Sequence, residues 1–412
     1  MANSIVTPDI FAKEAVMILE NELVVAKNVY RGHEKDFAMS VNGYEVGDTV
    51  SIRKPTDFTV RSGSVASNQD IVEGKTSITV DTMKGIDFAL TSTELTLDIK
   101  DLSKRVIRPA MVQIANAIDT DLMSLYTSVP SWVGTPGQVI NSFADFAQGP
   151  ERLDELAVPQ ERVSVLSPAD QWGLVGSQTA LYIQGAANEA YRKGNLGEIA
   201  GVDTYMSQNV PTHVVGVATG TPLVNGAGQD VTYLSVKDTG VQTLVTDGWT
   251  NSTTGILKKG DVFNIAGVYA VNPVSKAVLP FLRDFVVMAD ANSGASTGPA
   301  TLTISPPIIA SGAQQTVSAA PADNAPITVK GTGGTGYRQN MVFHRNAFAL
   351  AMVPLILPDG AVKAARQSYK GVSVRVVPYY DGINDINNWR LDVLYGKKAI
   401  DPRLATRLSG KA

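Results

Sequence analysis

The chain has 412 residues, a formal net charge of −4, 18% charged residues and no cysteine. This length suits two or three domains. The lack of cysteine excludes disulfides, a thiolate nucleophile and cysteine-ligated metals, and the negative balance argues against a broad basic surface for nucleic acid. The charged fraction is below the usual roughly 25%, which favours a surface covered by other subunits.

The N-terminal residues show no basic stretch followed by an apolar run and a cleavage site, and no apolar run approaches about 18 residues. We therefore expect no membrane segment, and a protein that is made and kept in the cytoplasm.

The first element predicted is an amphipathic helix. Thr7 can cap its exposed amides, Pro8 suits the first turn, and Asp9 lies near the positive end of the helix dipole. Two interpretations stay open for this arm: it packs on the core of its own chain, or a partner docks on it. Apolar residues follow at helical spacing: Ile10, Phe11, Ala15, Ile18, Leu19, Leu23 and Ala26.

The stretch from residue 36 to residue 90 has the pattern of an extended hairpin with a polar centre at residues 61–74. A two-stranded ribbon is marginal in water. This segment is therefore either a flexible surface loop or an arm that reaches a neighbouring subunit. Its predicted strands are 49–53, 58–60, 77–80 and 87–90.

Thr91 and Glu94 fit a capping box before the longest helical pattern of the chain, which runs from Leu102 to Leu125. Pro109 removes a helical hydrogen bond, so it should bend this helix or start a new segment.

The second half alternates between two kinds of sequence. Residues 142–213 mix helix and strand patterns, which predicts an α+β layer. Residues 217–336 are rich in Gly, Ser, Thr, Pro and Ala, and short strand patterns there predict a barrel or sandwich inserted into the first fold, which resumes near Tyr337. The expected strands are 231–236, 241–245, 262–269, 285–288, 301–305 and 327–329 in the module, then 372–377 and 389–395.

The sequence contains no complete motif for catalysis, for phosphate binding or for metal binding. GTGGTG at residues 331–336 lacks the Lys-Ser or Lys-Thr pair of a phosphate loop and is interpreted as a linker. His33, His213 and His344 are isolated in sequence and are expected to be structural or at the surface. We therefore nominate no catalytic residue, no metal site and no cofactor. The residues Asp381, Asn384, Asp385 and Asn387 lack calcium-loop spacing and predict a capped turn.

Several ordered segments resemble the tailed-bacteriophage major capsid protein family, and within it the short-tailed-phage coat proteins that carry an inserted β-barrel domain. The resemblance covers nearly the whole chain outside the module. The segments are GDTVSIRKP, SITVDTMKGIDFALTSTELTL, RVIRPAMVQIANAIDTDL, NSFADFA, LGEIAGVDTYMSQNVPTH and WRLDVLYGKKAIDPRL.

This resemblance implies the α+β capsid fold shared by tailed phages and herpesviruses. The implied parts are an N-terminal arm (1–35), an extended loop or β-ribbon (36–90), a peripheral domain with a long spine helix (91–141), an axial domain with returning peripheral strands (142–216 and 337–412) and an inserted β-barrel domain (217–336). The barrel is expected to stiffen the subunit and to touch neighbours from the outer surface.

The implied function is that of a major capsid protein, which assembles into the icosahedral shell around the double-stranded DNA of a tailed phage, without catalysis. The implied partners are other copies in hexamers and pentamers, a scaffolding protein, a portal protein and a decoration protein; the DNA is enclosed without specific binding, and no membrane is involved. The expected location is the virion, assembled in the host cytoplasm. Candidate subunit contacts are Arg53, Lys54, Asp57 and Arg61, and candidate scaffold contacts are Asp9 and Glu14.

Two other classes of protein fit parts of the sequence. A secreted surface-layer or adhesin protein would also be Gly-rich, Cys-free and β-rich, but the expected signal peptide is missing. An enzyme with a carbohydrate-binding barrel is the third hypothesis, and it lacks a catalytic site that can be named.

Overall fold

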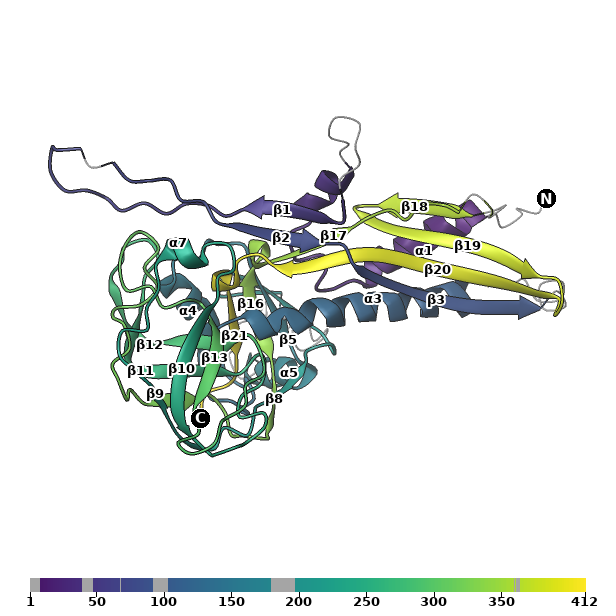
Figure 1. Ribbon diagram of the computed structural model, residues 1–412. Coiled ribbons are helices and arrows are strands. Elements are labelled where there is room, and N and C mark those ends of the chain that lie inside the picture. Colours follow the sequence, from purple (N-terminus) through teal and green to yellow (C-terminus); the bar gives the residue numbers. More distant parts are fainter. Residues whose placement is uncertain are drawn as a thin grey trace. The chain divides into compact units, whose positions relative to one another are not determined.

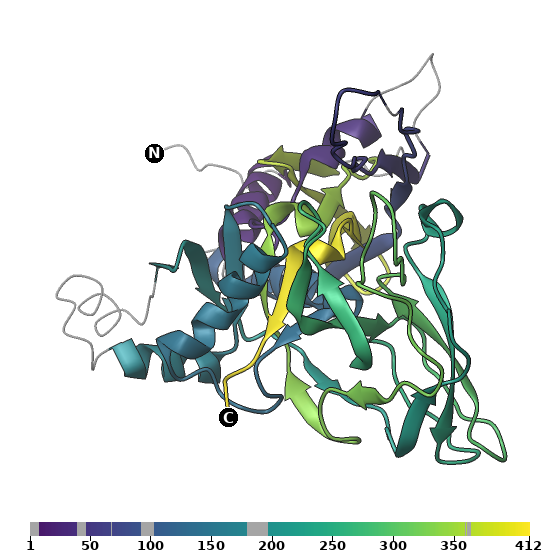
Figure 2. The same cartoon turned by 90° about the vertical axis from the view of Figure 1, so that its left-hand side faces the viewer.

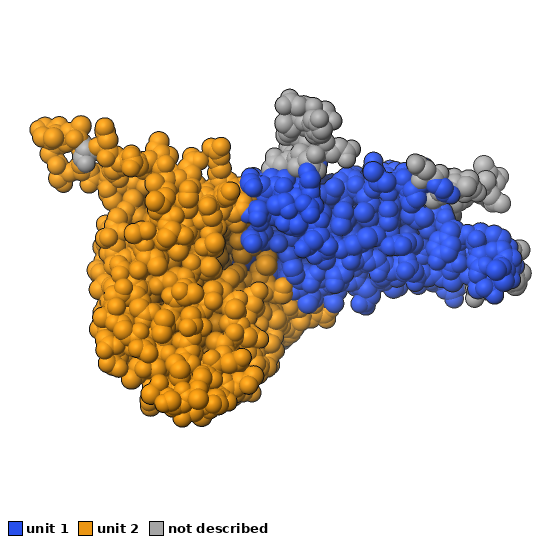
Figure 3. Space-filling model, viewed as in Figure 1, with its two compact units in different colours: residues 1–51, 77–123, 348–398 blue, residues 52–76, 124–347, 399–412 orange. Residues whose placement is uncertain are grey.

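The computed structural model describes residues 8–38, 47–66, 68–91, 103–178, 197–358, 360 and 364–412. The chain forms two compact units, coloured separately in Figure 3. Unit 1 contains residues 1–51, 77–123 and 348–398, and unit 2 contains residues 52–76, 124–347 and 399–412. Helices and strands both contribute, which confirms the α+β class.

Unit 1 is built on an antiparallel sheet in which the long strand β20 pairs with β19 on one side and with β3 on the other. Helix α1 packs against β18, β19 and helix α3. Its elements are α1 (Pro8–Glu22), the 3-10 helix η1 (Gly32–Ala38), β3 (Thr82–Thr91), the π-turn η2 (Ser103–Ile107), α3 (Arg108–Met123), β17 (Phe348–Met352), β18 (Ala365–Tyr369), β19 (Val372–Asp381) and β20 (Ile386–Ala399).

Aromatic stacking fixes α1 to the sheet. The ring of Phe11 lies 4.9 Å from that of Trp389, which also stacks on Phe88 at 6.4 Å. Phe11, Ala15 and Leu19 of the predicted apolar stripe are therefore buried within their own unit, whereas Ile10 at the start of the helix is exposed. Glu20 is also buried and pairs with Lys370 at 3.3 Å.

The arm helix is shorter than the apolar pattern, which continues to Ala26. Asp119 of α3 accepts hydrogen bonds from the backbone N–H groups of Val24 at 2.8 Å and Ala26 at 3.0 Å. Because these two N–H groups donate to a carboxylate and not to carbonyl groups of the preceding helical turn, α1 ends at Glu22.

The spine helix pattern divides into three pieces. The regular helix α3 begins at Arg108, so Pro109 occupies its first turn, where no N–H is needed. The π-turn η2 precedes it, and the 3-10 helix η3 (Ser124–Ser128) follows. The prediction that Pro109 starts a new segment is confirmed, whereas Thr7, Glu94 and Leu102 lie outside the described residues.

Unit 2 contains a mixed six-stranded sheet in the order β4-β21-β16-β5-β7-β6, covered by helices α4 and α5. Ser142 caps α4 by accepting the N–H of Asp145 at 3.1 Å. The elements are β4 (Ser131–Val133), α4 (Phe143–Glu155), β5 (Arg162–Leu166), α5 (Pro168–Gln178), β6 (Glu198–Ile199), β7 (Val202–Met206), β16 (Asn340–His344), the 3-10 helices η4 (Arg345–Ala347) and η5 (Pro402–Leu404), and β21 (Ala405–Leu408).

The inserted module forms an antiparallel six-stranded sheet in the order β14-β11-β12-β13-β10-β9. A bridge between Leu223 and Pro326 brings its two edges together, so the sheet curls around a common interior, seen in both Figure 1 and Figure 2. Its elements are β9 (Gly220–Val224), α7 (Tyr233–Val236), β10 (Gln242–Trp249), β11 (Val262–Val271), β12 (Val278–Val287), β13 (Ala300–Ser305) and β14 (Ile327–Val329).

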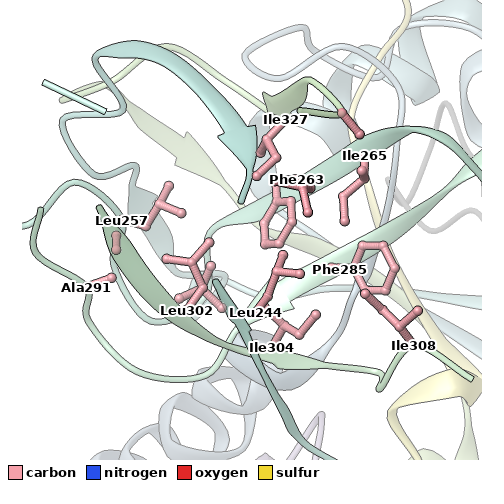
Figure 4. Close-up of a cluster of buried hydrophobic side chains, with 14 of the residues drawn as sticks. Leu244, Leu257, Phe263, Ile265, Phe285, Ala291, Leu302, Ile304, Ile308 and Ile327 are labelled. Carbon is pink, nitrogen blue, oxygen red and sulfur yellow. The ribbon is translucent and has the colours of Figure 1, made fainter. Parts of the chain in front are cut away.

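Apolar side chains fill the interior of the module. Phe263 and Phe285 lie with ring centroids 5.8 Å apart, and Leu244, Leu302 and Ile304 pack around them (Figure 4). All five are fully buried. The module thus has a hydrophobic core of its own.

Two strand predictions are wrong. Residues 233–236 form the short helix α7 rather than a strand, because Thr232 occupies an extended N-cap position and the chain turns immediately after it. Residues 58–60 form no strand, because Pro55 interrupts the chain two residues after the end of β1 (Thr49–Arg53), which pairs with β2 (Lys75–Thr79) in a two-stranded sheet.

Candidate assembly surfaces

The ribbon, defined here as residues 52–76, is an extended hairpin of unit 2 (Figure 1). Its two sides are joined by side chains. Thr59 donates its backbone N–H to Gln69 Oε1 at 2.9 Å, and Gln69 Nε2 donates to the carbonyl of Thr59 at 2.6 Å. Arg61 donates to the carbonyls of Gly63 and Val65 near the tip. These bonds shape the ribbon without burying it.

The four predicted contact residues of the ribbon have different surroundings. The side chain of Arg53 is 83% exposed and pairs with Glu73 at 3.2 Å, and that of Arg61 is also exposed. Lys54 Nζ reaches the carbonyl of Lys237 at 3.4 Å.

Asp57, the fourth residue, faces Arg403 with its carboxylate 3.9 Å from Nη1. Lys54 and Asp57 therefore make contacts inside the chain, while Arg53 and Arg61 present most of their charge to solvent. Their role in contacts between subunits stays a prediction.

Exposed apolar side chains on the ribbon were missed at the sequence level. Val60 is 98% exposed and Val65 is 83% exposed, and Phe58 and Ile71 are also open to solvent. The polar centre of this segment predicts a flexible surface loop or an arm that reaches a neighbouring subunit, and it does not single out these side chains. These few apolar side chains are exposed to solvent, and exposed apolar side chains that lie together are typical of a protein–protein contact.

The arm has a mixed outer face. Asp9 is exposed in the first turn of α1, and Ile10 and Met17 are exposed apolar neighbours on the same helix. Glu14 is half-buried and already interacts within the chain. Glu14 lies five positions after Asp9, which places the two side chains about 140° apart around the helix axis. The predicted pair therefore does not form one continuous acidic patch.

A further exposed group lies at the turn between β19 and β20 in unit 1. Tyr379, Tyr380 and Ile383 expose most of their surface there. Asp381 holds the turn, because it accepts the N–H of Ile383 at 2.9 Å and the side chain of Asn384 at 2.7 Å. These bonds match the capped turn predicted for the segment.

A buried network joins the module to the rest of unit 2. His213 Nδ1 lies 2.9 Å from the hydroxyl of Tyr126, and its Nε2 lies 2.7 Å from Asp261 Oδ1. Asp261 Oδ2 accepts the backbone N–H groups of Gly216 and Lys258 at 3.0 and 2.7 Å. His213 is thus buried in a hydrogen-bonded network, which fits the expectation that each of the three histidines is structural or at the surface.

Arg407 adds a buried cation to this network. It is fully buried, donates Nη1 to the carbonyl of Gly260 at 2.7 Å, and lies over the rings of Tyr126 and Trp132. Within the described chain, its Nε and Nη2 find no hydrogen-bond acceptor. Burial lowers the pKa of Arg407 to about 10, against the raising influence of the Tyr126 and Asp261 side chains. Contacts with aromatic rings take the place of an ion pair.

Asp284 makes a second joint from strand β12. Its carboxylate accepts the backbone N–H of Trp132 at 3.3 Å and lies 2.8 Å from Lys330 Nζ. Arg152, 3.9 Å from the same carboxylate, stacks on Phe281 at 3.5 Å. Because these bonds connect β4 and α4 to β12 and to Lys330, which directly follows β14, the module is attached at several points.

The GTGGTG segment lies where the chain enters and leaves the module. The incoming strand β8 (Thr212–Val214) pairs with the outgoing strand β15 (Gly336–Arg338). A Cβ on Gly333 would lie 2.1 Å from the carbonyl oxygen of Val217, so the backbones approach too closely for any side chain. This geometry fits the linker interpretation.

The described residues contain no group of three or more His, Cys, Asp or Glu side chains arranged to hold a metal ion. No helix among them has both the length and the apolar character to cross a membrane. What the surface offers instead is exposed apolar and charged side chains on extended elements.

Comparisons with known proteins agree with this picture. The family model described as P22 coat protein, gene protein 5, matches residues 1–410. A major capsid protein of Acyrthosiphon pisum secondary endosymbiont phage 1 is 24% identical over 384 residues, which cover 88% of this chain and 89% of the relative.

Two solved structures match with TM-scores below 0.5. A chain of Mycobacterium phage Che8 has 13% identity and a TM-score of 0.48, with 93% of this chain and 90% of that chain covered. The CUS-3 coat protein I-domain has 26% identity and a TM-score of 0.18, and covers 27% of this chain and 96% of its own length. On the strength of the match over residues 1–410, the chain belongs to the P22 coat protein family and is the major capsid protein of a tailed phage, a structural subunit of its shell.

Proposed function

We propose that the ribbon and the arm are the surfaces through which this subunit contacts other proteins during shell assembly. The observation that supports this most strongly is the exposure of Val60 and Val65 on a ribbon that has no hydrophobic core of its own. Burying each valine against another subunit would contribute about 1.5 kcal/mol or more. Such modest contacts, repeated over a shell, permit correction of errors during assembly.

The charged residues of the ribbon would give these contacts direction. Arg53 and Arg61 expose their guanidinium groups, which suit carboxylates on a neighbouring copy. Lys54 and Asp57 would act mainly inside the chain, where their present partners are Lys237 and Arg403. The neighbouring copies would be arranged as hexamers and pentamers.

Other partners follow from the role of a capsid subunit. A scaffolding protein with a basic segment would meet the arm at Asp9, whose exposure supports this role, with Glu14 contributing from a half-buried position. A portal protein and a decoration protein complete the set, and assembly would take place in the host cytoplasm. The net charge of −4 suits a shell that encloses double-stranded DNA without binding it specifically.

Charge reversal tests the role of the ribbon. The double variant R53E/R61E should remain a folded subunit, because an exposed pair such as Arg53–Glu73 contributes at most about 1 kcal/mol. Shells counted by electron microscopy, with a co-expressed scaffold, should be lost. The control K258E/K259E makes the same change in net charge at exposed module residues.

Normal shells at normal yield from R53E/R61E would refute the proposed role. Loss of shells from both double variants would also count against it, since the effect would then follow net charge rather than the ribbon.

A further inference from the structure

The base of the ribbon lies against one segment of the inserted module. This segment, Tyr233–Gly240, comprises helix α7 and the turn that follows it, and is called the clamp segment below. The backbone N–H of Lys75 donates to Asp238 Oδ1 at 2.9 Å, and Lys54 Nζ donates to the carbonyl of Lys237 at 3.4 Å. Both sides of the ribbon are therefore bonded to the same short piece of chain.

Gly74 brings the ribbon unusually close to the clamp segment. A Cβ on Gly74 would lie 2.4 Å from the carbonyl oxygen of Lys237 and 2.9 Å from the hydroxyl of Tyr233. The Tyr233 hydroxyl therefore lies directly beside the Gly74 backbone. Only glycine allows this approach without moving the backbone.

The clamp segment is itself fixed to the module. The N–H of Gly240 donates to the carbonyl of Val236 at 2.7 Å, and Ser305 Oγ donates to the carbonyl of Gly240 at 3.1 Å. Ser305 ends strand β13 of the barrel, so the ribbon base is bonded to a segment that the barrel holds in place.

The contacts at the ribbon base are polar and directional rather than tightly packed. A cavity of about 140 Å³ lies behind Arg53–Pro55, lined by Val236, Pro306, Ile309 and Pro402 among others. Arg403 and Asp401 also line this cavity, with the Arg403 guanidinium held by Asp401 at 2.8 Å, and Asp57 lies 3.9 Å from the same guanidinium. Since apolar packing leaves this space empty, the hydrogen bonds determine where the ribbon points.

The ribbon cannot set its own direction. Among the described residues of the ribbon, regular pairing is confined to the five-residue strands β1 and β2, and the polar bonds beyond Asp57 hold parts of the ribbon to one another. A two-stranded segment of this kind is marginal in water. Its orientation must come from whatever holds its base.

We infer that the inserted module positions the ribbon, with Asp238, Tyr233 and Gly74 as the positioning residues. The module thereby acts on assembly from inside its own subunit, in addition to any contact it makes with neighbours. The consequence for assembly rests on the proposed function, whereas the positioning itself is a property of the single subunit.

Spin labels can measure this positioning directly, because the chain has no cysteine to interfere. Cysteines replace the exposed residues Ser64, near the ribbon tip, and Thr254, on a module loop. Double electron–electron resonance on unassembled subunits then gives the distribution of the distance between the two labels. D238A and G74A should each widen this distribution at least about twofold, because each removes or displaces a base contact.

Matched variants separate the clamp from general damage. D238N keeps an oxygen that accepts the Lys75 N–H and should restore the narrow distribution. G47A adds a methyl group at a glycine with nothing within 4 Å and should leave it unchanged. Hydrogen exchange at the Lys75 amide should become about tenfold faster in D238A and should stay unchanged in D238N. D238A alters an exposed side chain, so it tests the inference even where G74A fails to fold.

Unchanged distributions in D238A and G74A would overturn the inference, and so would an equal widening in D238N. Shell formation is scored separately on the same variants. A widened distance distribution with normal shells supports the positioning of the ribbon by the clamp segment and contradicts the role of the ribbon in assembly. An unchanged distribution with lost shells contradicts the clamp and leaves the ribbon's role intact.

Discussion

His213 Nε2 and Asp261 Oδ1 lie 2.7 Å apart, and this contact joins the strand that leads into the module to the Lys259-Gly260-Asp261 turn inside it. The Asp261 carboxylate is fully buried and also accepts two backbone N–H groups. The pair therefore fixes the module to the strand from which it departs.

Replacing Asp261 with alanine should destabilise the subunit by about 3 kcal/mol or more. The substitution leaves His213 and the N–H groups of Gly216 and Lys258 without their acceptor in a buried site. Urea unfolding of the unassembled subunit measures the change. D323A is the matched control: Asp323 also accepts a loop N–H, from Gly226, but it is exposed, so the loss should stay below about 1 kcal/mol. Equal losses in the two variants would show that burial of Asp261 has no special importance.

Replacing Asp119 with asparagine should loosen the end of the arm helix. Both carboxylate oxygens accept backbone N–H groups, from Val24 and Ala26, and an amide would turn one acceptor into a donor facing a donor. We expect a loss of about 2 kcal/mol in the free energy of unfolding. Hydrogen exchange in residues 23–29 should rise in D119N and stay unchanged in the surface variant K13Q.

The same pair of proteins gives a pH test. Burial raises the pKa of Asp119 above its ordinary value, although the N–H donors of Val24 and Ala26 oppose the shift. When the pKa of a carboxyl group is higher in the folded than in the unfolded protein, its protonated form favours the folded state. This stabilisation is fully present below the pKa of the unfolded protein, about 3.9, and is lost as the pH rises through the pKa of the folded protein. The stability difference between wild type and D119N should therefore shrink from pH 4 to pH 7. A difference that grows over this range would contradict the assignment.

The sequence predicts best where one periodic stripe is buried against one neighbour. The stripe of α1, with Phe11 and Leu19 fully buried, and the stripe of α3 appear as 3.6-residue patterns because each helix covers a single face. The strand that begins at Val262 was also predicted, because its side chains are buried: Phe263 and Ile265 pack into the barrel, and Val262 packs against Trp132.

Prediction failed where the decisive contact is distant in sequence. Lys75 and Asp238 are 163 positions apart, and His213 and Asp261 are 48 positions apart, so no local sequence pattern predicts either hydrogen bond. The segment Val231–Val236 has the β-branched and aromatic residues of a strand, yet it turns into α7 beside the ribbon base. The exposed valines of the ribbon were missed because exposure depends on what surrounds a side chain.

Replacing Val60 and Val65 with serine should reduce shell formation without destabilising the subunit. Both side chains are almost fully exposed, so their removal costs the unassembled protein less than about 0.5 kcal/mol. Each should forfeit contact area in the shell. Light scattering follows the rate and extent of assembly. V274S, at an exposed valine of a module turn, is the control, and assembly of V60S/V65S at the wild-type rate would argue against a contact at the ribbon.

Excising residues 217–336 tests how far the module supports the rest of the subunit. Strands β8 and β15 pair where the module begins and ends, with Val214 opposite Gly336, so a short linker can close the gap. The excision removes Val262 and Val286, which pack against Trp132 and Tyr337, and it exposes those aromatic side chains. We expect a chain that aggregates or forms shells of the wrong size, as seen by electron microscopy of the product.

The isolated module provides the complementary measurement. Its sheet closes through the Leu223–Pro326 bridge around Phe263 and Phe285, so residues 217–336 should fold alone and melt cooperatively. A folded module together with a misassembling remainder would place the defect at the joint made by Asp261 and Asp284. Particles like those of the wild type from the excised chain would show instead that the module is dispensable for the shape of the subunit, and that the ribbon finds its direction without the clamp segment.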